Sequence, residues 1–148
     1  MNWILKKWEE LEPNEIHAIL KLRIDVFVVE QNCPYPELDG KDKYAYHLFC
    51  MEDDKALAVC RILPPGISYA EISIGRVATE LTCRKTGLGK SLMHEALNRI
   101  KSIWGNTSIT ISAQCYLENF YRKLGFETIS DIYLEDNIPH VKMMTSSY

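Results

Sequence analysis

Apolar residues recur along the chain at two spacings. Apolar residues at every second position predict strands, and apolar residues at every third or fourth position predict helices. The predicted strands cover residues 3–8, 44–51, 56–63, 68–79, 107–113, 126–134 and 140–144, and the predicted helices cover residues 13–29, 88–104 and 116–124. The resulting order is β-α-β-β-β-α-β-α-β-β, without an internal repeat or a linker. We therefore expect a single domain that spans residues 1–148.

The second predicted helix is amphipathic and begins in a glycine-bearing loop. This loop, residues 84–90, has the sequence Arg-Lys-Thr-Gly-Leu-Gly-Lys and follows the apolar run 72–78. Unpaired N–H groups at a helix N-terminus carry partial positive charge, and glycines let a ligand approach the backbone closely. The segment therefore predicts a site for an anion, most often a phosphate.

Three kinds of phosphate loop compete for this segment. A nucleotide-binding Walker A loop needs a glycine where Arg84 stands, and a dinucleotide-binding G-x-G-x-x-G loop needs a glycine where Leu92 stands. The R-x-x-G-x-G loop of acyl-CoA-dependent N-acetyltransferases is matched in full by Arg84, Gly87 and Gly89. A plain loop with a glycine cap is the alternative for an isolated G-x-G, but the flanking strand and helix favour the third kind of loop.

Composition and charge exclude several classes of partner. The chain is 47% apolar and 25% charged, as in ordinary globular proteins, and its net charge of −3 provides no basic field for nucleic acid. The five cysteines show no paired C-x-x-C spacing, so we expect reduced thiols in the cytoplasm and no metal site. No signal peptide and no run of membrane-spanning length is present, so we expect no membrane partner.

The first predicted helix and the segment after it carry further candidates for a functional role. Arg23 and Glu30 lie on one line of the helix and should face inward or into a cleft, so a buried ion pair and a substrate role both remain open for Arg23. The proline-containing segment 31–42 predicts an ordered loop, where specificity often resides. The pair Gly75-Arg76 inside a predicted strand suggests a β-bulge or a close backbone approach.

The order of elements, the R-x-x-G-x-G loop and the segment Asn-Phe-Tyr-Arg-Lys-Leu-Gly-Phe at 119–126 together resemble the GCN5-related N-acetyltransferase (GNAT) superfamily. Four further segments are similar to the ElaA-like branch of that superfamily: residues 26–35, 74–77, 113–114 and 135–140. The likeness covers almost the whole chain, and the segments occur in the expected order.

The resemblance implies an α+β fold, or α/β sandwich, with a mixed and mostly antiparallel sheet of about seven strands. Helices would flank the sheet, which would splay between the fourth and fifth strands. Acetyl-CoA, as co-substrate, would bind with its pantetheine along the open strand and its pyrophosphate on the loop. The implied contact residues are Val77, Ala78, Arg84, Lys85, Thr86, Gly87, Leu88, Gly89, Lys90 and Gln114, the last standing where many relatives have asparagine.

The resemblance also implies direct transfer of an acetyl group, in a ternary complex, to a primary amine of a small molecule or a peptide. Tyr121 occupies the position of the general acid in many relatives, and Glu30 is the first candidate for the general base. Glu71, His47, His140 and a solvent relay remain alternatives for the base. Acidic residues in the loop hint at a cationic acceptor: Glu30, Glu37, Asp39 and Asp42.

A non-catalytic acyl-CoA-binding regulatory domain is the second hypothesis for the function. Such a domain would keep the phosphate loop and lose the acid, whereas Tyr121 is present. Relatives are frequently homodimers, so the resemblance also allows a homodimer.

Overall fold

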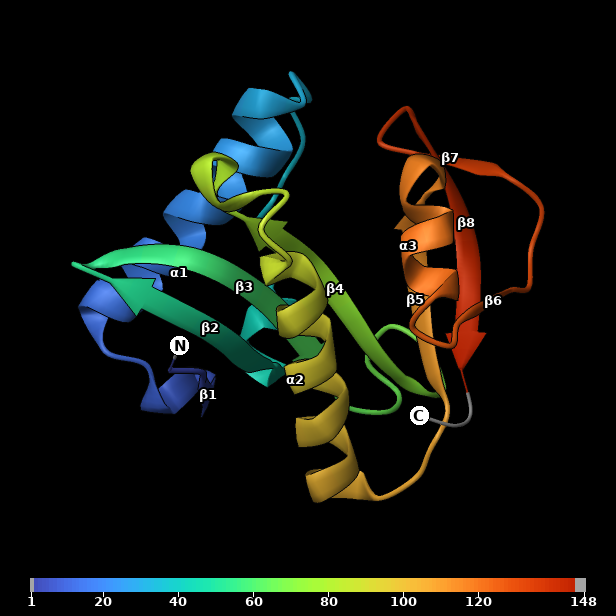
Figure 1. Cartoon of the computed structure of the whole chain (residues 1–148), viewed down its shortest axis with the longest axis horizontal. Helices are drawn as coiled ribbons and strands as arrows, with labels where there is room; N and C mark the ends of the chain where they lie inside the picture. The colour runs from blue at the N-terminus through green and yellow to red at the C-terminus, as the bar shows by residue number, and fades with distance from the viewer. Residues whose placement is uncertain (1, 146–148) are drawn as a thin grey trace.

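The computed structural model describes residues 2–145, which form one open sheet with helices packed on both faces (Figure 1). The strands are β1 (Ile4–Lys7), β2 (Tyr46–Glu52), β3 (Lys55–Leu63), β4 (Ile72–Thr79), β5 (Ile109–Gln114), β6 (Glu127–Thr128), β7 (Tyr133–Glu135) and β8 (Ile138–Thr145). The α-helices are α1 (Pro13–Ile24), α2 (Leu88–Trp104) and α3 (Glu118–Arg122). None of the helices in this described part is long and apolar enough to cross a membrane.

The sheet is antiparallel except at its centre. Its strand order is β1-β2-β3-β4-β5-β8-β6, and β7 also pairs with β8. The parallel neighbours β4 and β5 pair only at Ile72–Ile109 and Ser73–Thr110, and beyond these residues the two strands diverge (Figure 1). The predicted mixed, splayed sheet is therefore confirmed, with eight strands in place of about seven.

Two apolar cores lie on opposite faces of the sheet, because neighbouring strand residues point to opposite faces. Leu48 of β2 packs in the core that α2 and α3 cover, and the next residue, Phe49, packs in the core under α1. The apolar side of α2 is buried along its length, through Leu88, Leu92, Met93, Ala96, Leu97 and Ile100. This burial explains why the amphipathic pattern of α2 predicted its position correctly.

The type of one predicted helix differs from the prediction, and the predicted bounds are wrong at three other places. The first helix is α-helical only to Ile24 and continues as a π-helical turn over Asp25–Glu30. The strand predicted at 126–134 is interrupted, which gives the short β6 and β7, and this interruption accounts for the eighth strand. The fourth strand begins at Ile72, four residues later than predicted. The helix predicted at 116–124 is α-helical only over Glu118–Arg122.

The bulge suggested by Gly75-Arg76 is present in β4. Ala78 pairs with Val59 of β3, but Gly75 pairs with Arg61, so two residues of β4 lie opposite Cys60. Arg76, at the bulge, has a φ of 51°, in the left-handed region. The irregularity lies within the part of β4 that has separated from β5.

Candidate active site

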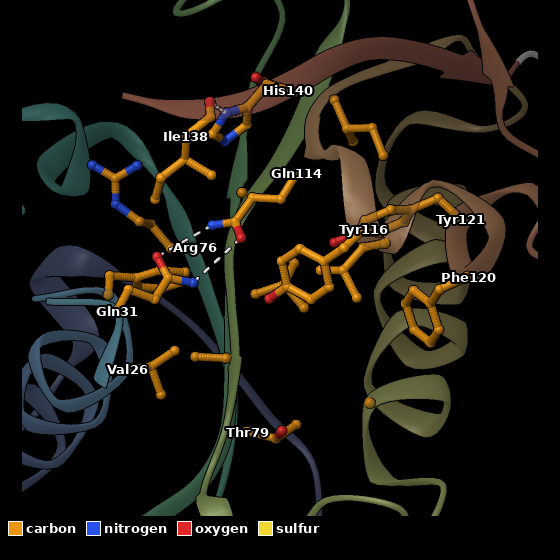
Figure 2. Close-up of a pocket in the computed structure, with 18 of the residues that line it drawn as sticks. Val26, Gln31, Arg76, Thr79, Gln114, Tyr116, Phe120, Tyr121, Ile138 and His140 are labelled. Atoms are coloured by element: carbon orange, nitrogen blue, oxygen red, sulfur yellow. Dashed lines mark hydrogen bonds between the residues drawn. The ribbon is translucent and has the colours of Figure 1, made fainter. Parts of the chain in front are cut away.

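A cavity of about 520 Å³ opens where β4 and β5 separate (Figure 2). The turn after α1, β4, the start of α2, β5, α3 and the β7–β8 hairpin all contribute to its walls. The cavity collects nearly all residues that the sequence assigned to a site: Glu30, Val77, Ala78, Arg84, Lys85, Gly87, Leu88, Gly89, Lys90, Gln114 and Tyr121. Thr86 does not line it; its hydroxyl donates a hydrogen bond to the Cys83 carbonyl.

The N-terminus of α2 forms one end of the cavity. Gly87 precedes the helix with a φ of 86°, a conformation that glycine adopts readily. Gly89 has no such backbone requirement, and a Cβ there would touch only Phe120 and Thr79, at an ordinary contact distance of 3.9 Å. Packing within the protein therefore leaves room for a side chain at Gly89. A bare backbone at this point is suited to a ligand that approaches the first turn of the helix closely.

Arg84 and Glu30 form a two-pronged ion pair at the same end of the cavity. Arg84 Nη1 donates to Glu30 Oε2 at 2.5 Å and Nη2 donates to Oε1 at 2.7 Å, while Nη2 also donates to the Thr79 carbonyl at 3.1 Å. The hydrogen bonds from Arg84 lower the pKa of Glu30, and the same pairing raises the pKa of Arg84. Glu30 is thus a weaker base in this state than an unpaired carboxylate.

Tyr121 lies in the wall of the cavity and belongs to the core under α2. Its ring makes edge-on contacts with Phe120 and Phe126, at centroid distances of 5.1 and 6.0 Å, and only 6% of the residue is exposed. Burial raises the pKa of Tyr121 well above its usual range, so its hydroxyl stays protonated at neutral pH. Complete transfer of the Tyr121 proton is therefore harder, but the hydroxyl can still donate a hydrogen bond.

Two contacts cross the cavity between the halves of the splayed sheet. Gln31 and Gln114 exchange a pair of side-chain hydrogen bonds, each 3.3 Å long (Figure 2). Cys33 Sγ donates to the Asp136 carbonyl at 3.4 Å. The loop after α1 therefore reaches across the opening to β5 and to the β7–β8 turn.

The structure places two of the four candidate bases in the cavity and two outside it. Glu30 and His140 line the cavity, whereas Glu71 and His47 do not. Glu71 accepts a hydrogen bond from Thr110, and His47 is buried beside the Asp42 carbonyl, where burial lowers its pKa. His140 Nδ1 lies 2.6 Å from the Ile138 carbonyl, and Nε2 lies 3.5 Å from Glu135 Oε2.

Comparison with known proteins decides the family. Residues 18–147 match the family described as acetyltransferase (GNAT) domain. The chain belongs to the GNAT family. This GNAT chain is 37% identical to the protein ElaA of Escherichia coli K12 over 136 residues, which are 90% of the chain and 89% of the relative.

Solved structures agree with this assignment. An acyl-CoA N-acyltransferase from Pseudomonas aeruginosa superimposes with a TM-score of 0.92 at 39% identity, covering 98% of this chain and 99% of the other. The crystal structure of E. coli ElaA gives a TM-score of 0.90 at 34% identity, with the same coverage. A more distant aminoglycoside 6'-N-acetyltransferase complexed with coenzyme A shares the fold alone, with a TM-score of 0.72 at 13% identity over 97% of this chain and 96% of that one. The protein is therefore an ElaA-like GNAT transferase.

The acidic residues of the loop after α1 are paired with arginines in this GNAT domain. We refer to Arg23, Arg61, Arg76, Glu37, Asp39 and Asp42 as the ionic cluster. Arg23 is 1% exposed and donates to Glu37 at 2.6 Å and to Asp42 at 2.8 Å, which selects the buried ion pair among the interpretations left open for it. Because arginines balance these carboxylates, the cluster gives no support to a cationic acceptor.

Three further residues line the cavity that were not predicted as site residues: Gln31, Tyr35 and Tyr116. Gln31 and Tyr35 lie inside the segment 26–35 that resembles the ElaA-like branch, so that segment carried the available signal. Tyr116 is 74% exposed and lies in the 3₁₀ turn Cys115–Leu117, which follows β5. The helix predicted at 116–124 carried no feature that marked Tyr116 as a site residue.

Proposed function

We propose that this GNAT protein transfers an acetyl group from acetyl-CoA to a primary amine, by direct attack in a ternary complex. The family uses acetyl-CoA, and a protein of the same fold has been crystallised with coenzyme A. The observation that carries the proposal is the meeting, in one cavity, of an unobstructed helix N-terminus and an open strand edge. The first suits a pyrophosphate and the second suits the amides of pantetheine.

The proposed binding residues divide between these two elements. The N–H groups of Leu88, Gly89 and Lys90 lack acceptors within the helix because they belong to its first turn, and they would hold the pyrophosphate. Lys85 and Lys90 would oppose its charge, and Thr86 would contribute through its backbone alone. Gln114 and the backbone at Val77 and Ala78 would contact the pantetheine. These donors suit a diphosphate ester that carries an amide-containing arm.

The proposed chemistry requires two groups beside the thioester. The attacking amine must lose a proton, and the leaving thiolate gains from a hydrogen-bond donor. Tyr121, protonated and in the cavity wall, would donate to the sulfur, and the backbone N–H groups of β4 would stabilise the oxyanion. We retain Glu30 as the proposed base. The basicity of Glu30 is low while its carboxylate is paired with Arg84. It would rise if Arg84 turned toward a bound phosphate and left the carboxylate unpaired.

Two further features belong to the proposal. The five free thiols suit a reducing compartment, so we propose the cytoplasm as the place of action. A non-catalytic acyl-CoA-binding domain is the alternative function, which predicts binding of acetyl-CoA without release of coenzyme A.

An assay of thiol release separates the enzyme from the binding domain. Purified protein and acetyl-CoA are mixed with a panel of primary amines: polyamines, amino sugars, amino acids and lysine-containing peptides. We expect at least one amine to cause saturable release of coenzyme A. Binding of acetyl-CoA without release above the rate with water, for the whole panel, would support the alternative.

Tyr121→Phe tests the proposed acid. We expect kcat with the responding amine to fall about 100-fold, because loss of an acid in the transition state costs on this order, while KM for acetyl-CoA changes little. Tyr44→Phe, at a position 65% exposed and outside the cavity, is the matched control. Equal activity of the two variants would exclude Tyr121 from the chemistry.

A further inference from the structure

The bulge of β4 holds a residue in an unfavourable backbone conformation. Arg76 has a φ of 51°, which costs energy for any residue with a Cβ, so the surrounding structure must impose it. Its neighbour in the chain is Gly75, which tolerates this conformation more easily, yet the left-handed position is occupied by the arginine. The contacts of the Arg76 side chain are the first place to look for what holds this conformation.

The Arg76 side chain contacts Glu37, through both its carboxylate and its backbone carbonyl, and also Asp39. Arg76 Nε donates to Glu37 Oε2 at 2.9 Å, and Nη2 donates to the Glu37 carbonyl at 3.2 Å and to Asp39 Oδ2 at 3.4 Å. The guanidinium carbon also lies 5.7 Å from the centre of the Tyr35 ring, within range of a cation–π contact. The bulge is thus clamped to the loop after α1.

Glu37 is itself held firmly, so the clamp has a fixed anchor. It is 4% exposed and accepts a second hydrogen bond on Oε2 from Arg23 Nε at 2.6 Å, while the Tyr35 hydroxyl donates to Oε1. Arg23 belongs to α1 and is fixed on its other side by Asp42. A chain of ion pairs therefore connects the bulge of β4 to α1 through Glu37.

The residue after Arg76 faces the cavity with its backbone. Backbone groups of strand residues two positions apart point to the same edge. The Thr79 carbonyl accepts hydrogen bonds from Arg84, which lines the cavity, so Val77 directs its N–H toward the same side. A turn of the backbone at Arg76 would change the direction of this N–H group directly.

We propose that Arg76, clamped by Glu37, is a positioning residue for acetyl transfer: it fixes the β4 bulge and thereby aims the Val77 N–H at the thioester carbonyl. This inference rests on the proposed function. Arg76 does not itself bind acetyl-CoA in this account, since its hydrogen bonds go to Glu37 and Asp39. It acts through the backbone of its neighbour.

Arg76→Gly is the variant that tests the clamp. Glycine keeps access to the left-handed conformation, and Glu37 keeps its pairing with Arg23, so no buried carboxylate is left without a cation. Asp54→Gly is the control, because Asp54 also has a positive φ of 64° but lies in the exposed turn between β2 and β3. Both variants relieve the same kind of backbone strain, but only Arg76→Gly removes the contacts with Glu37.

Two measurements are made on both variants and the wild type. The first compares the backbone amide resonance of Val77 with coenzyme A and with acetyl-CoA bound, which needs no acceptor amine. We expect an acetyl-dependent shift in the wild type and in Asp54→Gly, and its loss in Arg76→Gly. The second is the rate with the responding amine, for which we expect kcat of Arg76→Gly to fall about 10- to 100-fold. KM for acetyl-CoA should stay within about threefold, because the phosphate loop is unchanged.

The outcomes separate this proposal from the proposed function. An Arg76→Gly protein that keeps both the acetyl-dependent Val77 shift and the wild-type kcat overturns the clamp. If no amine supports turnover by the wild type, the proposed function fails, and the Val77 shift alone decides whether Arg76 positions the amide. A lowered melting temperature with an unchanged shift and kcat would assign Arg76 a structural role only and would also overturn the proposal.

Discussion

At the scale of single residues, the ion pair between Glu30 and Arg84 links the proposed base to the phosphate loop. The two side chains are 40% and 30% exposed, so water and an incoming anion can both reach the pair. A pyrophosphate on the loop would compete with the Glu30 carboxylate for the same guanidinium. Glu30 therefore weakens the positive field of the loop in the state described here.

Glu30→Gln tests this competition. We expect the Kd of coenzyme A to fall about two- to fivefold, since an exposed ion pair contributes about 1 kcal/mol or less and the freed Arg84 can turn to the phosphate. Titration calorimetry of wild type and variant measures this, with Glu9→Gln, at an exposed position outside the cavity, controlling for the lost charge. Weaker binding by Glu30→Gln would mean that the carboxylate positions Arg84 for the ligand.

The same variant tests Glu30 as the base. If Glu30 accepts the proton of the amine, Glu30→Gln should lower kcat/KM and abolish the acidic limb of its pH profile. An unchanged profile would assign the base to His140, the other candidate in the cavity, or to solvent.

At the scale of elements, sequence periodicity predicted those segments whose surroundings are simplest. The helix α2 was placed correctly because one side is buried along its whole length. The stretch Asp25–Glu30 was predicted as helix nearly to its end, but its π-helical form was not predicted, because that form depends on hydrogen bonds to residues after it, such as Cys33 N–H to the Val28 carbonyl. Loop 84–90 could be found from Arg84, its two glycines and the flanking strand and helix, which are all local signals.

The ionic cluster could not be predicted, because its pairs join residues 14 to 39 positions apart in the chain. Arg23 was placed inward by its helical position, but its partners depend on how the loop after α1 folds back on β3 and β4. A local sequence pattern does not show which side chains from distant segments will meet in the fold. The suggestion of a bulge at Gly75-Arg76 succeeded because glycine in a strand is a local signal.

The ionic cluster predicts an acid-sensitive stability. Burial raises the pKa of Asp39, but hydrogen bonds from Arg61 and from the Lys41 N–H outweigh it and hold the pKa at about 2. A carboxyl whose pKa is lowered by folding stabilises the protein above its unfolded pKa near ~3.9, and this stabilisation is lost as the pH falls toward 2. Urea unfolding at pH 7, 4 and 3 should therefore show a steep loss of stability in the acid range.

Asp39→Asn supplies the comparison. The variant should be less stable than the wild type at pH 7, and the difference between the two should shrink as the pH falls from 4 to 2. A difference in stability that stays constant over this range would show that Asp39 does not carry the acid sensitivity.

At the scale of the whole molecule, the splayed sheet forms two arms that meet at the base of β4 and β5 (Figure 1). The clamp at Arg76 fixes one arm, and the pairs Gln31–Gln114 and Cys33–Asp136 tie it to the other across the cavity. Each arm contributes to the proposed reaction: β4 provides the open edge, and β5 with α3 provides Gln114 and Tyr121. The fold therefore places residues distant in sequence around one opening.

The most direct test of the account is a thermal-shift comparison of wild type and Gly89→Glu with acetyl-CoA, coenzyme A and ATP. A side chain and a negative charge at Gly89 should block a pyrophosphate from the first turn of α2, whereas Asn98→Glu, on the exposed side of the same helix, should not. A ligand at 100 times its Kd stabilises the folded state by about 2.7 kcal/mol, which is several degrees in melting temperature. We predict that acetyl-CoA and coenzyme A raise the melting temperature of the wild type and of Asn98→Glu but not of Gly89→Glu. Stabilisation by ATP alone, or equal stabilisation of Gly89→Glu by acetyl-CoA, would contradict the assignment of this cavity as the acetyl-CoA site.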